Sequence, residues 1–99
     1  MIESEADICR AIRNHRLLEF RYRNSRRKVE PYAFGVDEGG HPVLRAYQVG
    51  GDDDRPFPAW KLFRGEEIAD LKVLDQRFAG PHEGYMRNDP AMPKVYCEL

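Results

Sequence analysis

Arginine side chains and aromatic rings are the groups in this sequence whose spacing could support binding chemistry. Between Arg10 and Lys28 the chain contains eight arginine or lysine residues and one acid, Glu19. A guanidinium group stays charged and can donate two parallel hydrogen bonds to one phosphate. The basic zone therefore predicts a surface for a nucleotide, a nucleic-acid strand or another anionic effector. The alternative is that these charges form the solvated faces of a helix and a strand.

Aromatic residues near this zone could stack on nucleobases, as they do in small β-domains that bind single strands. The candidates are Tyr22, Tyr32, Tyr47 and Trp60. Trp60 could instead anchor the rim of a barrel. Arg45 lies in the middle of a predicted strand, on the same face as Tyr47. Because a buried unpaired charge is costly, Arg45 must lie on an open face, pair with an acid or contact a ligand.

Residues that bind metals or catalyse reactions do not occur at useful spacings. The candidate metal ligands, which form no C-x-x-C or H-x-x-x-H pair, are Cys9, His15, His41, His82 and Cys97. Neither Ser4 nor Ser25 lies in a G-x-S-x-G elbow, and the chain has no Gly-rich phosphate loop. The consecutive acids at 52–54 could hold a hard cation, but they are typical of a solvated loop. We therefore expect a binding protein with no catalytic residue, no metal and no cofactor.

Local patterns predict one helix followed by five short strands. Ser4 can cap a helix that runs to about His15, with an apolar stripe formed by Ile8, Ala11 and Ile12. From Leu18 the apolar period changes to two, which is typical of a half-buried strand. Strands are expected at about residues 18–22, 27–36, 43–49, 60–63 and 68–74, separated by turns. Pro31 lacks an N–H, so an edge, a bulge or a bend is expected there.

These elements predict a mainly β domain with a short N-terminal helix, a small five-stranded SH3-like or Sm-like barrel over residues 1–78. Closing the sheet would cover the edges of its short strands. Residues 79–99 are expected to form an extended C-terminal arm, because prolines and glycines break every period there. Apolar residues in the arm suggest that it packs on the domain or on a partner subunit. A disordered tail is the alternative.

The composition predicts a soluble globular protein, with 33% charged residues and a net charge of −1. No apolar run approaches the ~20 residues of a membrane helix. The acidic N-terminus lacks the apolar core of a signal peptide, so we expect a cytoplasmic protein with no membrane partner. In that compartment Cys9 and Cys97 are expected to be free thiols.

Residues 11 to about 62 resemble the WYL domain of bacterial regulators. The matching segments are Ala11-Ile12, Phe20-Arg21-Tyr22, Arg27-x-Val29-Glu30-Pro31-Tyr32, Val43-Leu44-Arg45-Ala46-Tyr47, and Arg55-x-Phe57 with Lys61-Leu62. The third segment is similar to the family's R-x-v-E-P-y and the last to its R-x-F-x-x-x-R-I. The name-giving Trp-Tyr-Leu is Pro42-Val43-Leu44 here, and Lys61 stands in place of the second arginine of the last motif.

The resemblance implies an Sm-like barrel and a sensor that works by binding an anionic effector. It also implies a role in transcription regulation. No helix-turn-helix segment precedes the matching residues, so a free-standing module is expected. The ligand-facing positions that it implies are Arg27, Tyr32, Arg45, Arg55 and Lys61, to which the ring chemistry above adds Tyr47 and Trp60. The alternative function is a protein-interaction or homo-oligomerisation module that uses the arm and binds no small molecule.

Overall fold

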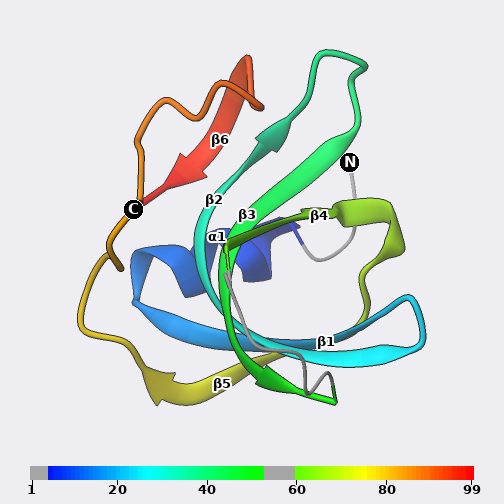
Figure 1. Cartoon of the computed structure of the whole chain (residues 1–99), viewed down its shortest axis with the longest axis vertical. Coiled ribbons are helices and arrows are strands. Elements are labelled where there is room, and N and C mark those ends of the chain that lie inside the picture. The colour runs from blue at the N-terminus through cyan, green and yellow to red at the C-terminus, as the bar shows by residue number, and fades with distance from the viewer. Residues whose placement is uncertain (1–4, 53–59) are drawn as a thin grey trace.

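One short helix and six strands form the parts of the chain that the computed structural model describes, residues 5–52 and 60–99 (Figure 1). They are α1 (Glu5–Arg13), β1 (Arg16–Tyr22), β2 (Ser25–Val36), β3 (Pro42–Gly51), β4 (Trp60–Arg64), a 3-10 turn (Gly65–Glu67), β5 (Ala69–Arg77) and β6 (Lys94–Glu98). The mainly β class with one helix is confirmed. The expected helix cap at Ser4, and the candidates Asp53, Asp54 and Arg55, lie outside the described residues. Neither described range contains a helix with the length and apolarity needed to cross a bilayer.

Helix α1 lies against β1, β2 and β6 through its apolar stripe. Ile8, Ala11 and Ile12 are fully buried, whereas Arg10 and Arg13 are exposed. The acidic residues of the helix lie in its first turn and the basic residues in its last, which is the order that the helix dipole favours. The helix ends at Arg13, and His15 in the turn that follows has a left-handed φ of 55°, which directs the chain into β1.

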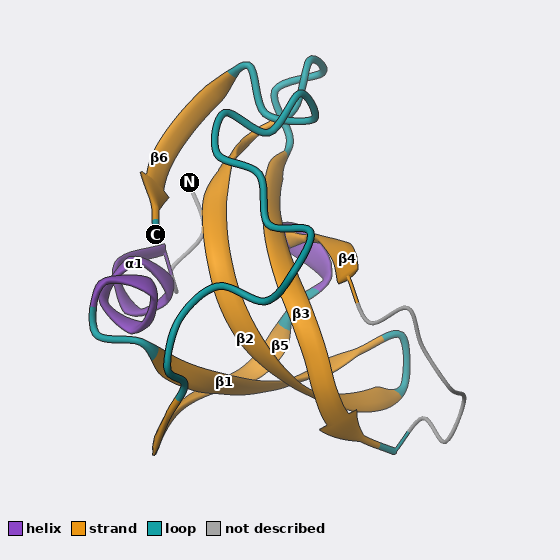
Figure 2. Cartoon of the chain, turned by 60° about the vertical axis from the view of Figure 1, so that its left-hand side comes forward, coloured by secondary structure: helices purple, strands orange, loops and turns teal. Residues whose placement is uncertain are grey.

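The strands form one antiparallel sheet in the order β4-β3-β2-β1-β5, and the long strands β2 and β3 are strongly curved (Figure 2). This arrangement is consistent with a small barrel-like fold. An edge, a bulge or a bend was expected at Pro31, and the structure has a bulge, because the β2–β3 register shifts between Pro31 and Ala33. β1 pairs with the first part of one edge of β2, residues 25–29, and β6 pairs with residues 33–36 of the same strand. Strand β6 lies within the predicted arm, where the sequence patterns indicated no sixth strand.

The core lies between α1 and the concave side of the sheet. The alternating residues Leu18, Phe20 and Tyr22 point inward, as predicted, and each is at most 6% exposed. Phe63 of β4 packs edge-on against the rings of Phe20 and Tyr22, with ring centroids 5.0 and 4.9 Å apart. Complete burial of such side chains contributes about 1.5–3 kcal/mol each. This core therefore fixes β4 beside β1 and the start of β2.

The two cysteines form a disulfide between α1 and β6, so the expectation of free thiols is wrong. Cys9 and Cys97 lie 88 residues apart in the chain, and their Cα atoms are 5.7 Å apart. They meet because β6 pairs with β2 next to the buried face of α1. The disulfide joins the C-terminal strand to the N-terminal helix.

The arm, residues 79–99, packs on the convex side of β2 and β3, and Figure 2 shows its loop crossing in front of these strands. Met92 is buried with Ala33 and Val43. Tyr85 packs against the cluster around Tyr32, and its hydroxyl donates a hydrogen bond of 2.8 Å to the carbonyl oxygen of Leu99. The arm therefore covers the sheet face opposite to the core.

Candidate functional site

A concave surface between the end of β1, the start of β2 and β4 brings several cations together. Its volume is about 470 Å³, and we call it the basic groove. It is lined by Tyr22, Arg23, Arg27, Trp60, Lys61, Leu62, Phe63 and Arg64. β4 contributes the last five of these residues, and its pairing with β3 holds them opposite the β1–β2 hairpin. Three of the sequence-predicted site residues, Arg27, Trp60 and Lys61, therefore share one surface.

Arg27 is the half-buried cation at the centre of the basic groove. Its guanidinium carbon lies 5.6 Å from the centroid of the Tyr22 ring and 5.9 Å from that of Phe63. These distances are within the range of cation–π attraction. Its Nη1 donates a hydrogen bond of 3.2 Å to Oε1 of Gln48, while its buried Nε has no hydrogen-bond partner among the described residues. Arg27 is thus held in place by two rings and an amide but retains donor capacity.

Gln48 is a residue of this site that sequence reasoning missed. It is 1% exposed, and its Nε2 has no hydrogen-bond partner in the described part of the chain. Buried polar atoms normally have partners, so Nε2 of Gln48 and Nε of Arg27 are two exceptions that lie side by side at the base of the groove. The signal in the sequence was an amide on the core-facing side of β3, in line with Leu44 and Ala46.

Two further contacts shape the ends of the basic groove. The backbone N–H of Arg64 donates a hydrogen bond of 3.0 Å to the Tyr22 hydroxyl, which fixes the ring beneath Arg27. Arg23 pairs with Glu67, with 3.0 Å between Nε and Oε1. This hydrogen bond lowers the pKa of the Glu67 carboxyl, so Glu67 stays ionised and neutralises Arg23. Arg27, Lys61 and Arg64 are the remaining cationic side chains of the groove.

The arm packs beside Arg45, and of the three alternatives given for this residue the structure shows pairing with an acid. Nε of Arg45 lies 2.6 Å from Oδ2 of Asp89, and Nη2 lies 3.4 Å from Oδ1. Asp89 is 6% exposed. Burial favours its neutral acid form, but the hydrogen bonds from Arg45 and from the N–H of Ala91 outweigh burial and lower its pKa. Arg45 and Asp89 therefore form an ion pair in which Asp89 is buried and Arg45 is half-buried.

The remaining predicted rings also lie under the arm. Tyr47 stacks on the imidazole of His82, with ring centroids 3.8 Å apart and planes within 7°. The indole N–H of Trp60 donates a hydrogen bond of 2.9 Å to the carbonyl oxygen of Glu83. Tyr32 is completely buried, and its hydroxyl donates a hydrogen bond of 2.8 Å to Glu30. Burial and this carboxylate raise the pKa of Tyr32, so its phenol remains neutral.

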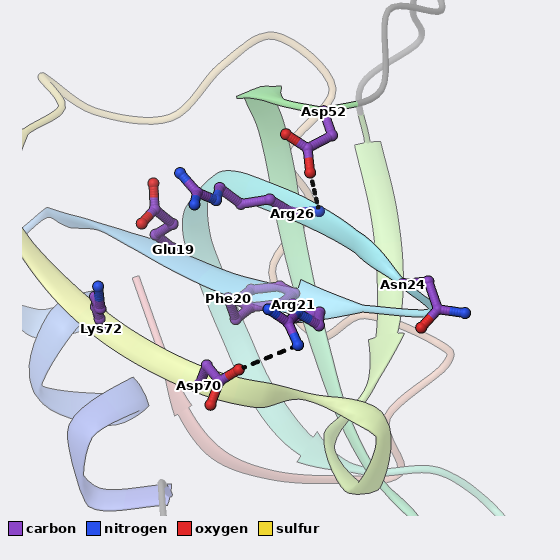
Figure 3. A pocket seen from close by; sticks show the side chains of 8 residues that line it. All are labelled: Glu19, Phe20, Arg21, Asn24, Arg26, Asp52, Asp70 and Lys72. Carbon is purple, nitrogen blue, oxygen red and sulfur yellow. Dashed lines mark hydrogen bonds and ion pairs between the residues drawn. The ribbon is translucent and has the colours of Figure 1, made fainter.

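A larger cavity than the basic groove lies on the outer face of β1 and β5 and has a volume of about 540 Å³. Its charged side chains are Glu19, Arg21, Arg26, Asp52, Asp70 and Lys72. Figure 3 shows Arg21 directed toward Asp70, 3.8 Å away, and Asp52 accepting a hydrogen bond from the backbone N–H of Arg26. Three acids balance three bases here. The basic groove is therefore the better anion site, although it is smaller.

The predicted residues consequently separate into two surfaces that share Trp60. Arg27 and Lys61 lie in the basic groove, Arg45 and Tyr47 lie under the arm, and Tyr32 is interior. Arg55 lies outside the described residues. Within residues 5–52 and 60–99 no three His, Cys, Asp or Glu side chains are grouped in a way that could hold a metal ion.

The fold is that of a small, mainly β domain with one short helix. The model of the WYL domain family matches residues 4–73, and the chain belongs to this family. Searches of curated proteins and of solved structures found no match. WYL domains are in general regulatory, ligand-sensing domains. The match ends within β5, so the arm lies beyond the segment that the family model describes.

Proposed function

We propose that this WYL domain is a regulatory sensor that binds an anionic ligand of the nucleotide class, as a single nucleotide or as a nucleic-acid strand, in the basic groove. The observation that carries the proposal is Arg27, a half-buried guanidinium that lines the groove between two rings and whose Nε has no partner among the described residues. A phosphate in the groove would pair with this guanidinium through a charge-assisted hydrogen bond, which is stronger than a neutral one.

The neighbours of Arg27 support a phosphate rather than an isolated carboxylate. Lys61 and Arg64 line the same groove, so the positive charge extends along β4 beyond a single point. Trp60 is partly exposed at the edge of the groove and offers a ring for a base. Stacking of a base on an aromatic side chain contributes about 1–3 kcal/mol. Phosphate contacts with adjacent stacking are the chemistry of a nucleotide site.

Sensing without catalysis is the activity that this arrangement supports, since the described residues that line the groove offer cations and rings, and none of them is a nucleophile beside a base. A cytoplasmic location and a role in transcription regulation remain predictions. The homo-oligomer interface expected of the arm also remains a prediction. Met92 and Tyr85, which could have served that interface, pack on the arm's own domain.

The experiment is a fluorescence-anisotropy titration of a labelled dT oligonucleotide, with ATP and inorganic pyrophosphate as competitors. Competition by ATP but not by pyrophosphate would assign the site to a nucleotide with its base. We expect Arg27→Gln to weaken binding about tenfold, because a hydrogen bond to a charged group contributes about 1.5–3 kcal/mol. Lys61→Gln should lower both the affinity and the salt dependence, since fewer counterions are released.

Arg77→Gln is the matched control. It removes one positive charge from an exposed position that pairs with Arg16, at the end of β1 remote from Tyr22. Binding by this variant should equal that of the wild type. The proposal is overturned if the wild type binds none of the three probes at low salt, or if Arg77→Gln weakens binding as much as Arg27→Gln does.

A further inference from the structure

A second cavity lies between β4 and the arm, on the other side of Trp60 from the basic groove. Its volume is about 290 Å³, and its walls are formed by Trp60, Tyr85, Met86 and Pro90, with Arg45 and Asp89 as its charged lining residues. We call it the arm cavity. We propose that the arm cavity is a binding site for a small planar aromatic carboxylate, and that Asp89 occupies the carboxylate position at Arg45 as an internal substitute for the ligand.

The carboxylate preference follows from the geometry at Arg45. Two nitrogen atoms of the guanidinium contact two oxygen atoms of Asp89, at 2.6 and 3.4 Å. This fork matches any carboxylate that approaches in the same plane. The side chain of Arg45 remains 28% exposed, so the guanidinium borders the cavity rather than being sealed beneath it. A ligand carboxylate can therefore take the position of Asp89 without leaving Arg45 unpaired.

The preference for a ligand with a planar ring follows from the side chains that form the walls of the arm cavity. The rings of Trp60 and Tyr85 are nearly parallel, with an interplanar angle of 18° and centroids 6.2 Å apart. Met86 is 63% exposed beside them, which leaves an adaptable apolar surface for a flat molecule. The volume is at the small end for ligand pockets, which favours one or two fused rings.

The arm contacts β3 and β4 with the kinds of side-chain group that a bound peptide would offer. It places a carboxylate on Arg45, an imidazole on Tyr47 and a phenol ring beside Trp60. Gly84 allows this approach, because a Cβ there would lie 3.0 Å from Nε1 of Trp60. These groups come from residues beyond the family-model match. The contacts are thus a feature of this chain's own arm, and the inference is independent of the proposed function of the basic groove.

The test is a titration of the isotope-labelled protein with indole-3-acetate, followed by the indole N–H resonance of Trp60. Trp60 is the only tryptophan, so the signal is unambiguous. Indole-3-acetamide, which lacks the charge, and acetate, which lacks the ring, are the matched ligands. We expect indole-3-acetate to shift the resonance at concentrations at which neither analogue does. Equal shifts from the amide, or no shift in the wild type, would overturn the proposal.

Variants test the role of Asp89 as an internal competitor. Asp89→Asn should tighten indole-3-acetate binding about tenfold, because the ligand then no longer has to displace the Asp89 carboxylate from Arg45. Adding Arg45→Gln to Asp89→Asn should abolish that gain. Glu83→Gln removes the same charge from an exposed arm position and should leave the affinity unchanged. A gain in Glu83→Gln equal to that in Asp89→Asn would contradict the assignment. If Asp89→Asn does not fold, the wild-type titration decides the proposal. Arg27→Gln, which changes the basic groove, should alter neither the shift of the Trp60 resonance nor the gain in affinity from Asp89→Asn.

Discussion

The carboxylate of Glu30 and the imidazole of His82 meet at 2.6 Å, Oε1 to Nδ1, although 52 residues separate them in the chain. Glu30 is 7% exposed, and the same oxygen accepts the hydrogen bond from the Tyr32 hydroxyl. The backbone N–H of His82 donates a hydrogen bond of 3.2 Å to that hydroxyl in return. His82 is therefore the residue through which the start of the arm is held on β2.

Replacing His82 tests this attachment. We expect His82→Ala to lower the free energy of unfolding by about 1–3 kcal/mol, because it leaves a buried carboxylate with one partner fewer. Hydrogen exchange of the arm amides should rise by more than that of β1. Urea unfolding and exchange by NMR measure the two effects. His41→Ala is the control, since His41 pairs with Glu66 at an exposed site where an ion pair contributes about 0–1 kcal/mol. Equal losses in both variants would show that the buried network does not hold the arm.

The disulfide makes a separate prediction about stability. Cys9 and Cys97 close a loop of 88 residues, and chain-entropy arguments give about 4.6 kcal/mol for a loop of that length. We expect Cys97→Ser to lower the unfolding free energy by about that amount, and reductant to do the same to the wild type. Urea unfolding with and without dithiothreitol measures both. Reductant should have no effect on the variant, and a wild type that is insensitive to reductant would contradict the pairing.

The Arg45–Asp89 pair predicts how stability responds to acid. The pKa of Asp89 is lower in the folded protein than its ordinary value of 3.8, so the unfolded chain binds a proton more readily. The pair therefore contributes its full stabilisation above that value, and the contribution disappears as the pH falls through the folded pKa. Melting temperatures measured by circular dichroism between pH 6 and pH 2 should fall less steeply for Asp89→Asn than for the wild type. If the melting temperatures of the two proteins fell in parallel with pH, Asp89 would not contribute to the acid dependence of stability.

The strands and their faces could be predicted because they depend on local order in the sequence. Leu18, Phe20 and Tyr22 alternate with charged residues, and a pleated strand places alternate side chains on opposite faces. Pro31 indicated an irregularity in β2 because it lacks an N–H, and the register shift next to it is that irregularity. β6 was not predicted, since Lys94–Glu98 is short and becomes a strand through its pairing with β2. The pairing of Cys9 with Cys97 was not expected, because free thiols were inferred from the predicted cytoplasmic setting and the sequence does not show that the two ends of the chain meet.

The sequence by itself determined the family, the helix with its apolar stripe, and the residue types available for binding. Only the tertiary structure decided which of these residues share a surface. It placed Arg27 and Lys61 in one groove, buried Tyr32, and gave Arg45 a partner 44 residues away in Asp89. The physical reason is that periodicity acts over neighbouring residues, whereas the partner of a charge depends on where the curved sheet brings distant segments together.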